Sequence, residues 1–211
     1  MSEENQGVPL PIATHGDNPE CLTAIFQEEV NLATWHRTLP GQITNFAAKF
    51  ADEAGSFERF VGLEADDKLE QIVPGWALEL PGANAWLADV QEIIDMYRCL
   101  FEPAAVGVRL HVLPTTMCPR FHTDRVPARL LVTYNGRGTE WLPERLVNRG
   151  SHSGPLPNQI VEERDIQVMP TGSVNLLKGE AWEGNEGRGV VHRSPEPGDQ
   201  PRLVLGLDWL S

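Results

Sequence analysis

Residues 106–124 read VGVRLHVLPTTMCPRFHTD, and the expected fold class follows from this stretch. Up to residue 112, apolar residues alternate with glycine, arginine and histidine, which is the two-residue period of a strand with one buried face. The stretch ends in His122-Thr123-Asp124. Alternate residues of an extended chain share a side, so the histidine and the aspartate would lie on the same face. The sequence therefore predicts a strand segment that delivers an imidazole and a carboxylate to one site.

The rest of the C-terminal half also has sequence patterns that are typical of β-strands. Short apolar runs separated by glycine and proline occur at 128–134, 190–192 and 203–209, with weaker strand candidates at 160–169 and 173–177. Many short strands punctuated in this way predict an antiparallel sandwich or jelly roll.

The N-terminal half shows helical spacing instead. Apolar residues recur at three- and four-residue intervals at 43–50 and, most clearly, at 85–101, where Asn84 can cap the helix and Pro103 ends it. Residues 30–35 fit either a helix or a strand.

Together these patterns predict an α+β protein that is mainly β. We expect an acidic, mostly helical support region over residues 1–103 and a jelly-roll or cupin-like core over residues 104–211, which carries the metal site, as one integrated domain.

Charge is spread unevenly along the 211 residues, whose formal net charge is −13. Residues 1–103 hold 5 basic and 18 acidic residues, whereas residues 104–211 hold 12 of each, and eleven of those basic residues are arginine. The acidic half disfavours a long nucleic acid as partner, because such binding needs cations that neutralise phosphates. The arginines suit contacts with carboxylates or phosphates, or structural ion pairs.

Cysteine usage and the chain start bear on the compartment. The cysteines Cys21, Cys99 and Cys118 cannot all pair and form no C-x-x-C, and the first residues are acidic rather than signal-like. No apolar run reaches the length of a membrane span. We expect reduced thiols in a cytoplasmic protein that does not enter a membrane, and the pattern predicts no particular oligomeric state.

A second histidine and an arginine extend the pattern begun by His122 and Asp124. Sixty-seven residues separate Asp124 from His192, and Arg202 follows ten residues later. Two histidines and one carboxylate can occupy one triangular face of an octahedral ion and leave three positions open, as in non-heme Fe(II) oxygenases. Arg202 would lie on the next strand and point into the same barrel, where a guanidinium can bind a carboxylate with two hydrogen bonds.

In this order of His122, Asp124, His192 and Arg202, residues 105–211 resemble the Fe(II)/2-oxoglutarate-dependent oxygenases. The resemblance implies a double-stranded β-helix, Fe(II) held by the two histidines and the aspartate, and the cosubstrate 2-oxoglutarate anchored by the arginine. It also implies a hydroxylase-type reaction in which the cosubstrate is oxidatively decarboxylated to succinate. The substrate, a small molecule or a peptide, stays open.

Further resemblances concern the strand after the motif and the motif itself. Tyr134 and Asn135 resemble positions that contact 2-oxoglutarate in this family. The run Cys-Pro-Arg-Phe-His-Thr-Asp at 118–124, with Gly-Thr-Glu-Trp-Leu-Pro at 138–143, is similar to a bacterial family classed only as a domain of unknown function. That likeness gives no substrate and leaves a link to zinc homeostasis open.

Several residues have two interpretations. Cys118 is either a fourth ligand, which would suit zinc in a closed site, or a buried thiol. Arg202 is either the cosubstrate clamp or the partner of Asp208 or Glu140 in an ion pair. His111 points either into the core or away from it.

The leading prediction is an Fe(II)- and 2-oxoglutarate-dependent oxygenase. The alternatives are a non-catalytic zinc-binding, cupin-like protein and a metal-free jelly roll that binds partners through its acidic half.

Overall fold

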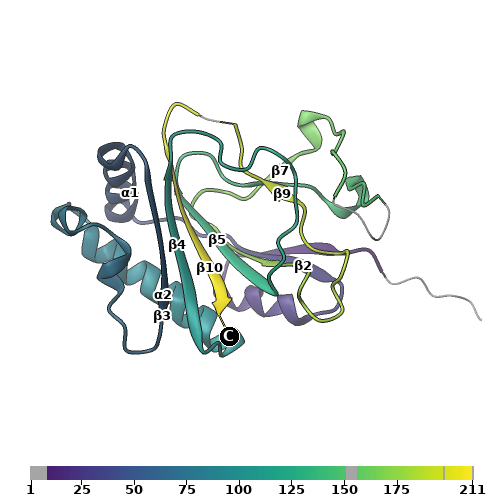
Figure 1. Cartoon of the computed structure of the whole chain (residues 1–211), viewed down its shortest axis with the longest axis horizontal. Coiled ribbons are helices and arrows are strands. Elements are labelled where there is room, and N and C mark those ends of the chain that lie inside the picture. Colours follow the sequence, from purple (N-terminus) through teal and green to yellow (C-terminus); the bar gives the residue numbers. More distant parts are fainter. Residues whose placement is uncertain (1–8, 151–155, 197, 211) are drawn as a thin grey trace, which may run out of the picture.

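The structure is a computed structural model that describes residues 9–150, 156–196 and 198–210. A seven-stranded sheet in the order β1-β2-β8-β5-β10-β4-β3 forms its centre (Figure 1), and a smaller sheet has the order β7-β6-β9. The strands of the described residues are β1 (Ile12–Gly16), β2 (Val30–Trp35), β3 (Phe57–Leu63), β4 (Ala105–Leu113), β5 (Ala128–Asn135), β6 (Glu140–Trp141), β7 (Gln167–Val168), β8 (Val174–Lys178), β9 (His192–Arg193) and β10 (Arg202–Leu210).

The small sheet packs on one face of the large sheet. Leu32 of β2, Leu131 of β5 and Leu177 of β8 form one apolar cluster with Trp141 of β6 and with Met169, the residue after β7. Two facing sheets joined by such a cluster are what a jelly roll requires.

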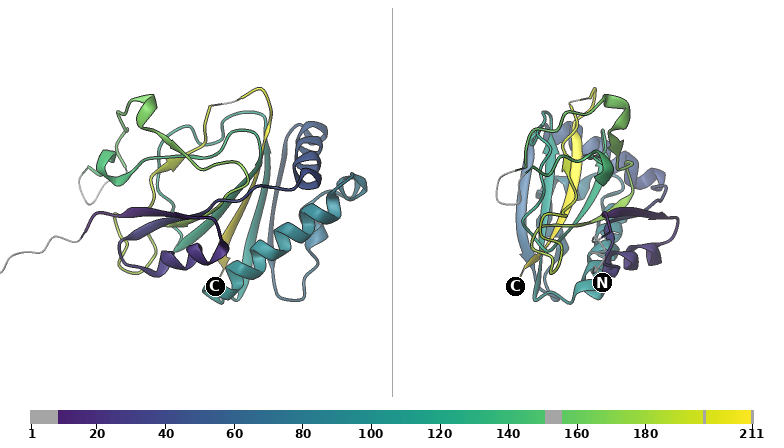
Figure 2. Two further views of the ribbon diagram at one scale, coloured as in Figure 1. Left: turned by 180° about the vertical axis from the view of Figure 1, so that it is seen from behind. Right: turned by 90° about the vertical axis from the view of Figure 1, so that its right-hand side faces the viewer.

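Helices cover the opposite face of the large sheet, as the turned views show (Figure 2). They are α1 (Gly41–Ala54) and α2 (Ala83–Phe101). The described residues also form short 3₁₀ segments, at Pro19–Phe26, Leu69–Ile72, Gly75–Glu79, Glu144–Leu146 and Glu163–Asp165. The apolar stripe of α2 is buried, and its buried side chains after Ala83 are Trp86, Val90, Ile93, Ile94, Tyr97 and Phe101. Burial of each large apolar side chain contributes roughly 1.5–3 kcal/mol, so this layer is a major part of the core.

Alternation along the strands separates the core from the site. Val108, Leu110 and Val112 of β4 are buried in the helix-side core, whereas Arg109 and His111 line the pocket on the other face. One face of the sheet therefore packs against the helices, and the other face lines the pocket.

The start of α2 differs from the sequence prediction. The helix begins at Ala83 after Gly82, whose φ is +89°, and Asn84 does not cap it. A Cβ at Gly82 would lie 2.4 Å from the carbonyl oxygen of Gln42 in α1, a clash that only glycine avoids. Close approach of the two helices decides this boundary, and local capping does not.

Strand assignments also differ in places. The first 103 residues supply β1, β2 and β3 as well as both α-helices, so residues of both predicted regions lie in the same sheet. Within 160–169, only Gln167–Val168 is a strand. The His122 segment is an isolated β-bridge to His192, and the extended strand predicted for residues 122–124 is wrong.

Among the described residues, no helix combines the length and the apolar character needed to cross a membrane.

Candidate metal centre and its pocket

The two motif histidines lie on neighbouring chain segments. The backbone N–H of His122 donates to the carbonyl of His192, and the reverse bond is made as well, both at 3.0 Å. Their ring centroids are 4.5 Å apart. This reciprocal pair brings residues from distant parts of the sequence to one point, which is why the sequence alone could not position them.

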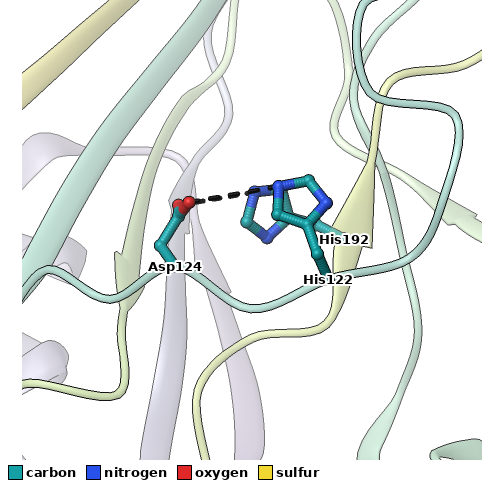
Figure 3. Close-up of side chains that lie close together, drawn as sticks. All are labelled: His122, Asp124 and His192. Atoms are coloured by element: carbon teal, nitrogen blue, oxygen red, sulfur yellow. Dashed lines mark ion pairs between the residues drawn. The ribbon is translucent and has the colours of Figure 1, made fainter. Parts of the chain in front are cut away.

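Asp124 completes the cluster from the other side. Figure 3 shows its carboxylate facing both imidazoles, with Oδ2 3.5 Å from His192 Nε2 and Oδ1 4.0 Å from His122 Nε2. One donor atom from each of the three residues lies within 4.8 Å of the others. The predicted triad is therefore brought together.

The tautomers of the two histidines leave their Nε2 atoms free. His122 Nδ1 lies 3.0 Å from the carbonyl oxygen of Arg120, and His192 Nδ1 lies 3.0 Å from that of Val190. A ring nitrogen facing a carbonyl carries the proton, so each Nε2 presents a lone pair. Burial is the main influence on His192: it lowers the pKa of the imidazole against the opposing charge of Asp124, which favours the neutral, metal-binding form.

This arrangement suits a cation. Asp124 Oδ2 is buried and accepts no hydrogen bond among the described residues, although it faces His192 Nε2. Two lone-pair donors directed at each other repel unless a cation lies between them, and a buried unpartnered carboxylate oxygen is costly. The donor set fits a divalent metal, and its three donors leave coordination positions open.

The Asp124 carboxylate is held by a buried charge network. Arg129 Nη1 donates to Asp124 Oδ1 at 2.7 Å, and Arg129 Nε donates to Asp208 Oδ1 at 2.7 Å. Arg109 Nε donates to Asp208 Oδ2 at 2.6 Å. The network fixes Oδ1 of Asp124 and leaves Oδ2 directed at the histidines.

The cluster borders a cleft on the sheet face opposite the helices, which we call the metal pocket. Its lining residues are Arg109, His111, Leu113, Met117, Cys118, His122, Arg129, Leu131, Thr139, His192, Arg193, Ser194, Arg202, Val204 and Gly206.

Arg202 lines the metal pocket and is 5% exposed. Its Nε donates to the carbonyl of Arg137 at 2.6 Å and its Nη2 to Thr139 Oγ1 at 3.1 Å. No carboxylate lies within ion-pair distance of it in the described part of the chain. Burial lowers the pKa of Arg202 to about 10, with Glu140 acting in the opposite direction.

Arg202 does not form the ion pair with Asp208 or Glu140 that the sequence left open. Asp208 is bound by Arg109 and Arg129, and Glu140 is bound by Arg193 at 2.6 Å. A buried guanidinium without a counter-charge beside a metal site is suited to receive an anion.

Two predicted cosubstrate contacts are not at the metal pocket. Tyr134 faces the helices, where its hydroxyl donates to Asp89 Oδ2 at 2.6 Å. Asn135 donates to the carbonyl of Pro201 at 2.8 Å and, like Tyr134, borders a different cavity. For Tyr134 the reason is the strand period: the pocket side of β5 carries Arg129 and Leu131, and Tyr134 falls on the opposite side. Asn135 is the last residue of β5, and its amide is taken up by the Pro201 carbonyl.

Two further sequence candidates line the metal pocket. Cys118 does so, but its sulfur is outside the donor group of His122, Asp124 and His192. His111 points into the pocket, and its Nδ1 is buried without a hydrogen-bond partner among the described residues. Burial lowers the pKa of His111.

The sequence prediction did not include Arg129 and Arg109 as site residues and gave Asp208 only as a partner of Arg202. A signal for all three was present, because each is a charged residue inside an otherwise apolar strand. A charge in such a place is retained only with a partner, but spacing does not identify which partner.

Comparison with known proteins gives a family and a fold. A family model described as "Protein of unknown function (DUF1826)" matches residues 16–208. No curated protein matches the chain.

Two solved structures with the same fold are oxygenases. A Pseudomonas putida prolyl-4-hydroxylase has a TM-score of 0.52 at 10% identity, over 90% of this chain and 98% of that one. AtDAO1 of Arabidopsis thaliana, a dioxygenase for auxin oxidation solved with 2-oxoglutarate, has a TM-score of 0.53 at 12% identity, over 96% of this chain and 93% of that one. At this identity the likeness establishes the fold, and the predicted double-stranded β-helix with helical support is confirmed.

Proposed function

We propose that this chain, which belongs to the DUF1826 family of proteins of unknown function, is an Fe(II)- and 2-oxoglutarate-dependent oxygenase. The observation that carries the proposal is the unpartnered Asp124 Oδ2 facing the free Nε2 of His192, in the same pocket as a buried arginine without a carboxylate partner.

In this proposal His122, Asp124 and His192 hold the metal through Nε2, Oδ2 and Nε2. The chemistry that Fe(II) would supply when bound is the activation of dioxygen, coupled to conversion of 2-oxoglutarate into succinate and carbon dioxide. The carbonyls of Arg120 and Val190 keep both imidazole rings in the metal-binding tautomer.

Arg202 binds the distal carboxylate of 2-oxoglutarate. Its bonds to the Arg137 carbonyl and to Thr139 hold the guanidinium in one orientation, so little freedom is lost when the anion binds. The site lies between β4, β5 and β10 of the large sheet and β9 of the small sheet.

A zinc-binding protein is the main alternative, and Cys118 would then complete a closed four-donor site. The three-donor geometry favours an open site, because the Cys118 sulfur is outside the group.

The test is an anaerobic titration of metal-stripped protein with Fe(II) and then with 2-oxoglutarate. We expect the weak visible charge-transfer band of the chelate. Arg202→Gln should weaken 2-oxoglutarate binding roughly 10- to 100-fold, since one charge-assisted pair contributes about 1.5–3 kcal/mol, and should leave Fe(II) affinity unchanged.

Arg137→Gln is the matched control, because that side chain is exposed on the adjoining turn and only its backbone contacts Arg202. If iron binds without the band, 2-oxoglutarate is not the cosubstrate. If only zinc binds tightly and Cys118→Ser weakens it, the zinc-binding alternative holds.

A further inference from the structure

The metal pocket contains more cationic side chains than the proposed function uses. Four of its lining residues are arginine, and none of the described lining residues is acidic, in a chain of net charge −13. Positive charge gathered in one cleft of an acidic protein favours a small anionic ligand over a long polyanion.

Three of the four arginines are already engaged. Arg129 donates hydrogen bonds to Asp124 and Asp208. Arg193 donates to Glu140. Arg202 is assigned to the cosubstrate. Arg109 is the one whose binding groups remain available.

Arg109 is held through its Nε atom, and its two terminal nitrogens are available to a ligand. Its Nε donates to Asp208 at 2.6 Å, and its guanidinium carbon lies 4.7 Å from the ring centre of Phe60. In the described part of the chain, neither terminal nitrogen of Arg109 donates a hydrogen bond, and its side chain is 43% exposed. A guanidinium held in this way offers a preorganised fork for a carboxylate.

His111 adds a second donor on the same face of β4. The residue is only 8% exposed, and its Nδ1 is buried without a partner. Its Nε2 is not among the buried unpartnered atoms, so it is the ring nitrogen that reaches the pocket. An orphaned buried N–H is rarer than an orphaned acceptor, which places the proton on Nε2 as a donor.

The strand register places Arg109 farther from the cosubstrate end than His111. Arg109 pairs with Gly206 and His111 pairs with Val204 on β10, which begins at Arg202. Four residues of strand correspond to about 13 Å. A short diacid that is bound at Arg202 and also chelates the metal does not extend to Arg109.

Gly206 of β10 lies beside Arg109. A Cβ at Gly206 would meet Leu131 at 3.6 Å and the Cβ of Arg109 at 3.7 Å, both ordinary contacts. Leu113 and Met117 line the same pocket, so the space next to the guanidinium has apolar walls.

Charge balance favours a single negative charge. With Fe(II) and the cosubstrate dianion bound, the metal and Arg109, Arg129 and Arg202 carry one more positive charge than Asp124, Asp208 and 2-oxoglutarate. A carboxylate compensates this excess, whereas a phosphate dianion would exceed it.

On the basis of the proposed function, we propose that Arg109 and His111 bind the carboxylate of the primary substrate, and that this substrate is a small organic acid with an apolar body. The metal then faces the apolar part, which is where oxidation would occur.

The test uses phenylacetate and its uncharged analogue phenylacetamide as probes. Each is titrated by calorimetry, without oxygen, into protein loaded with Fe(II) and 2-oxoglutarate, and also into metal-free protein. We expect wild-type protein to bind phenylacetate at least roughly tenfold more tightly than the amide, the scale of one charge-assisted pair. Arg109→Gln should remove this preference, and Arg164→Gln, which removes an arginine from an exposed pair with Glu162, should keep it.

Met117→Ala provides a second variant that leaves every charge in place. It should weaken phenylacetate and phenylacetamide equally, because it removes an apolar wall of the pocket and no donor.

Three outcomes would overturn the inference: no binding of phenylacetate, equal affinity in wild-type and Arg109→Gln proteins, or displacement of phenylacetate by 2-oxoglutarate. Failure of the proposed function is a different result. In that case the chelate band is absent, while metal-free protein still binds phenylacetate through Arg109.

Discussion

The two oxygens of the Asp124 carboxylate have different surroundings. Arg129 donates to Oδ1 at 2.7 Å, whereas Oδ2 is buried and accepts no hydrogen bond among the described residues. Asp208 accepts hydrogen bonds from Nε and Nη2 of the same Arg129 guanidinium, and these bonds keep Arg129 in place. A carboxylate held by one oxygen offers the other to a metal in a fixed direction, so Arg129 acts as a positioning residue.

Arg129→Gln should therefore weaken metal binding. We expect a roughly 10- to 100-fold loss of Zn(II) or Fe(II) affinity, the range typical for loss of a partner of a metal ligand, measured by competition with a chromophoric chelator. Arg129→Lys should recover part of the loss because it retains the charge.

Arg164→Gln is the control, since it removes an arginine from an exposed pair with Glu162. Thermal unfolding of each variant shows whether a loss of metal affinity comes from a misplaced Asp124 carboxylate or from a loss of the folded state. Unchanged metal affinity in a folded Arg129→Gln protein would show that Asp124 needs no such support.

Helix α2 is attached to the sheet by a buried polar contact as well as by its apolar stripe. Asp89 of α2 accepts a hydrogen bond from Tyr134 of β5 at 2.6 Å and from Arg37 Nη2 at 2.9 Å. Burial raises the pKa of Tyr134 well above its ordinary value, so the hydroxyl remains a donor. This contact joins the helix, β5 and the segment after β2.

Tyr134→Phe should destabilise the protein without affecting the metal pocket. Loss of a buried hydrogen bond to a charged group costs about 1.5–3 kcal/mol of unfolding free energy, measured by urea unfolding, and 2-oxoglutarate affinity should stay unchanged.

The chain offers a matched control in Tyr97→Phe. The Tyr97 hydroxyl donates to the neutral carbonyl of Ala128 at 3.1 Å, so a smaller loss of about 0.5–1.5 kcal/mol is expected. A clear fall in 2-oxoglutarate affinity for Tyr134→Phe would return this residue to the cosubstrate site.

The free energy of unfolding of the whole molecule depends on pH because two histidines are buried. Burial lowers the pKa of both His111 and His192 below the ordinary value of 6.5. The unfolded chain therefore takes up these protons first as the pH falls, and stability is lost from about pH 6.5 downward until the folded-state pKa values are reached.

The metal-free protein should have a lower free energy of unfolding at pH 5.5 than at pH 7.5. Each group contributes at most about 1.4 kcal/mol per pH unit in this window. His111→Asn should reduce the slope in urea unfolding, whereas Arg164→Gln, at an exposed position outside the metal pocket, should leave it unchanged. Equal slopes for the two variants would contradict the assignment to His111.

The class of the fold and the types of ligand follow from the amino-acid sequence alone. The two-residue period of residues 106–112 and the helical period of residues 85–101 are local properties, because each follows from which side chains one element must bury. The spacing of His122, Asp124, His192 and Arg202 identified a donor set through the chemistry of these residue types.

Which of these groups contact one another depends on the three-dimensional fold. The bridge between His122 and His192, the sharing of Asp208 by two arginines, and the turn of Tyr134 toward the helices depend on strand register across distant segments. A shift of one residue would reverse the face of every side chain on a strand. Register is set by pairing and packing of the whole sheet, and for this reason the partners of each charge could not be derived from the sequence.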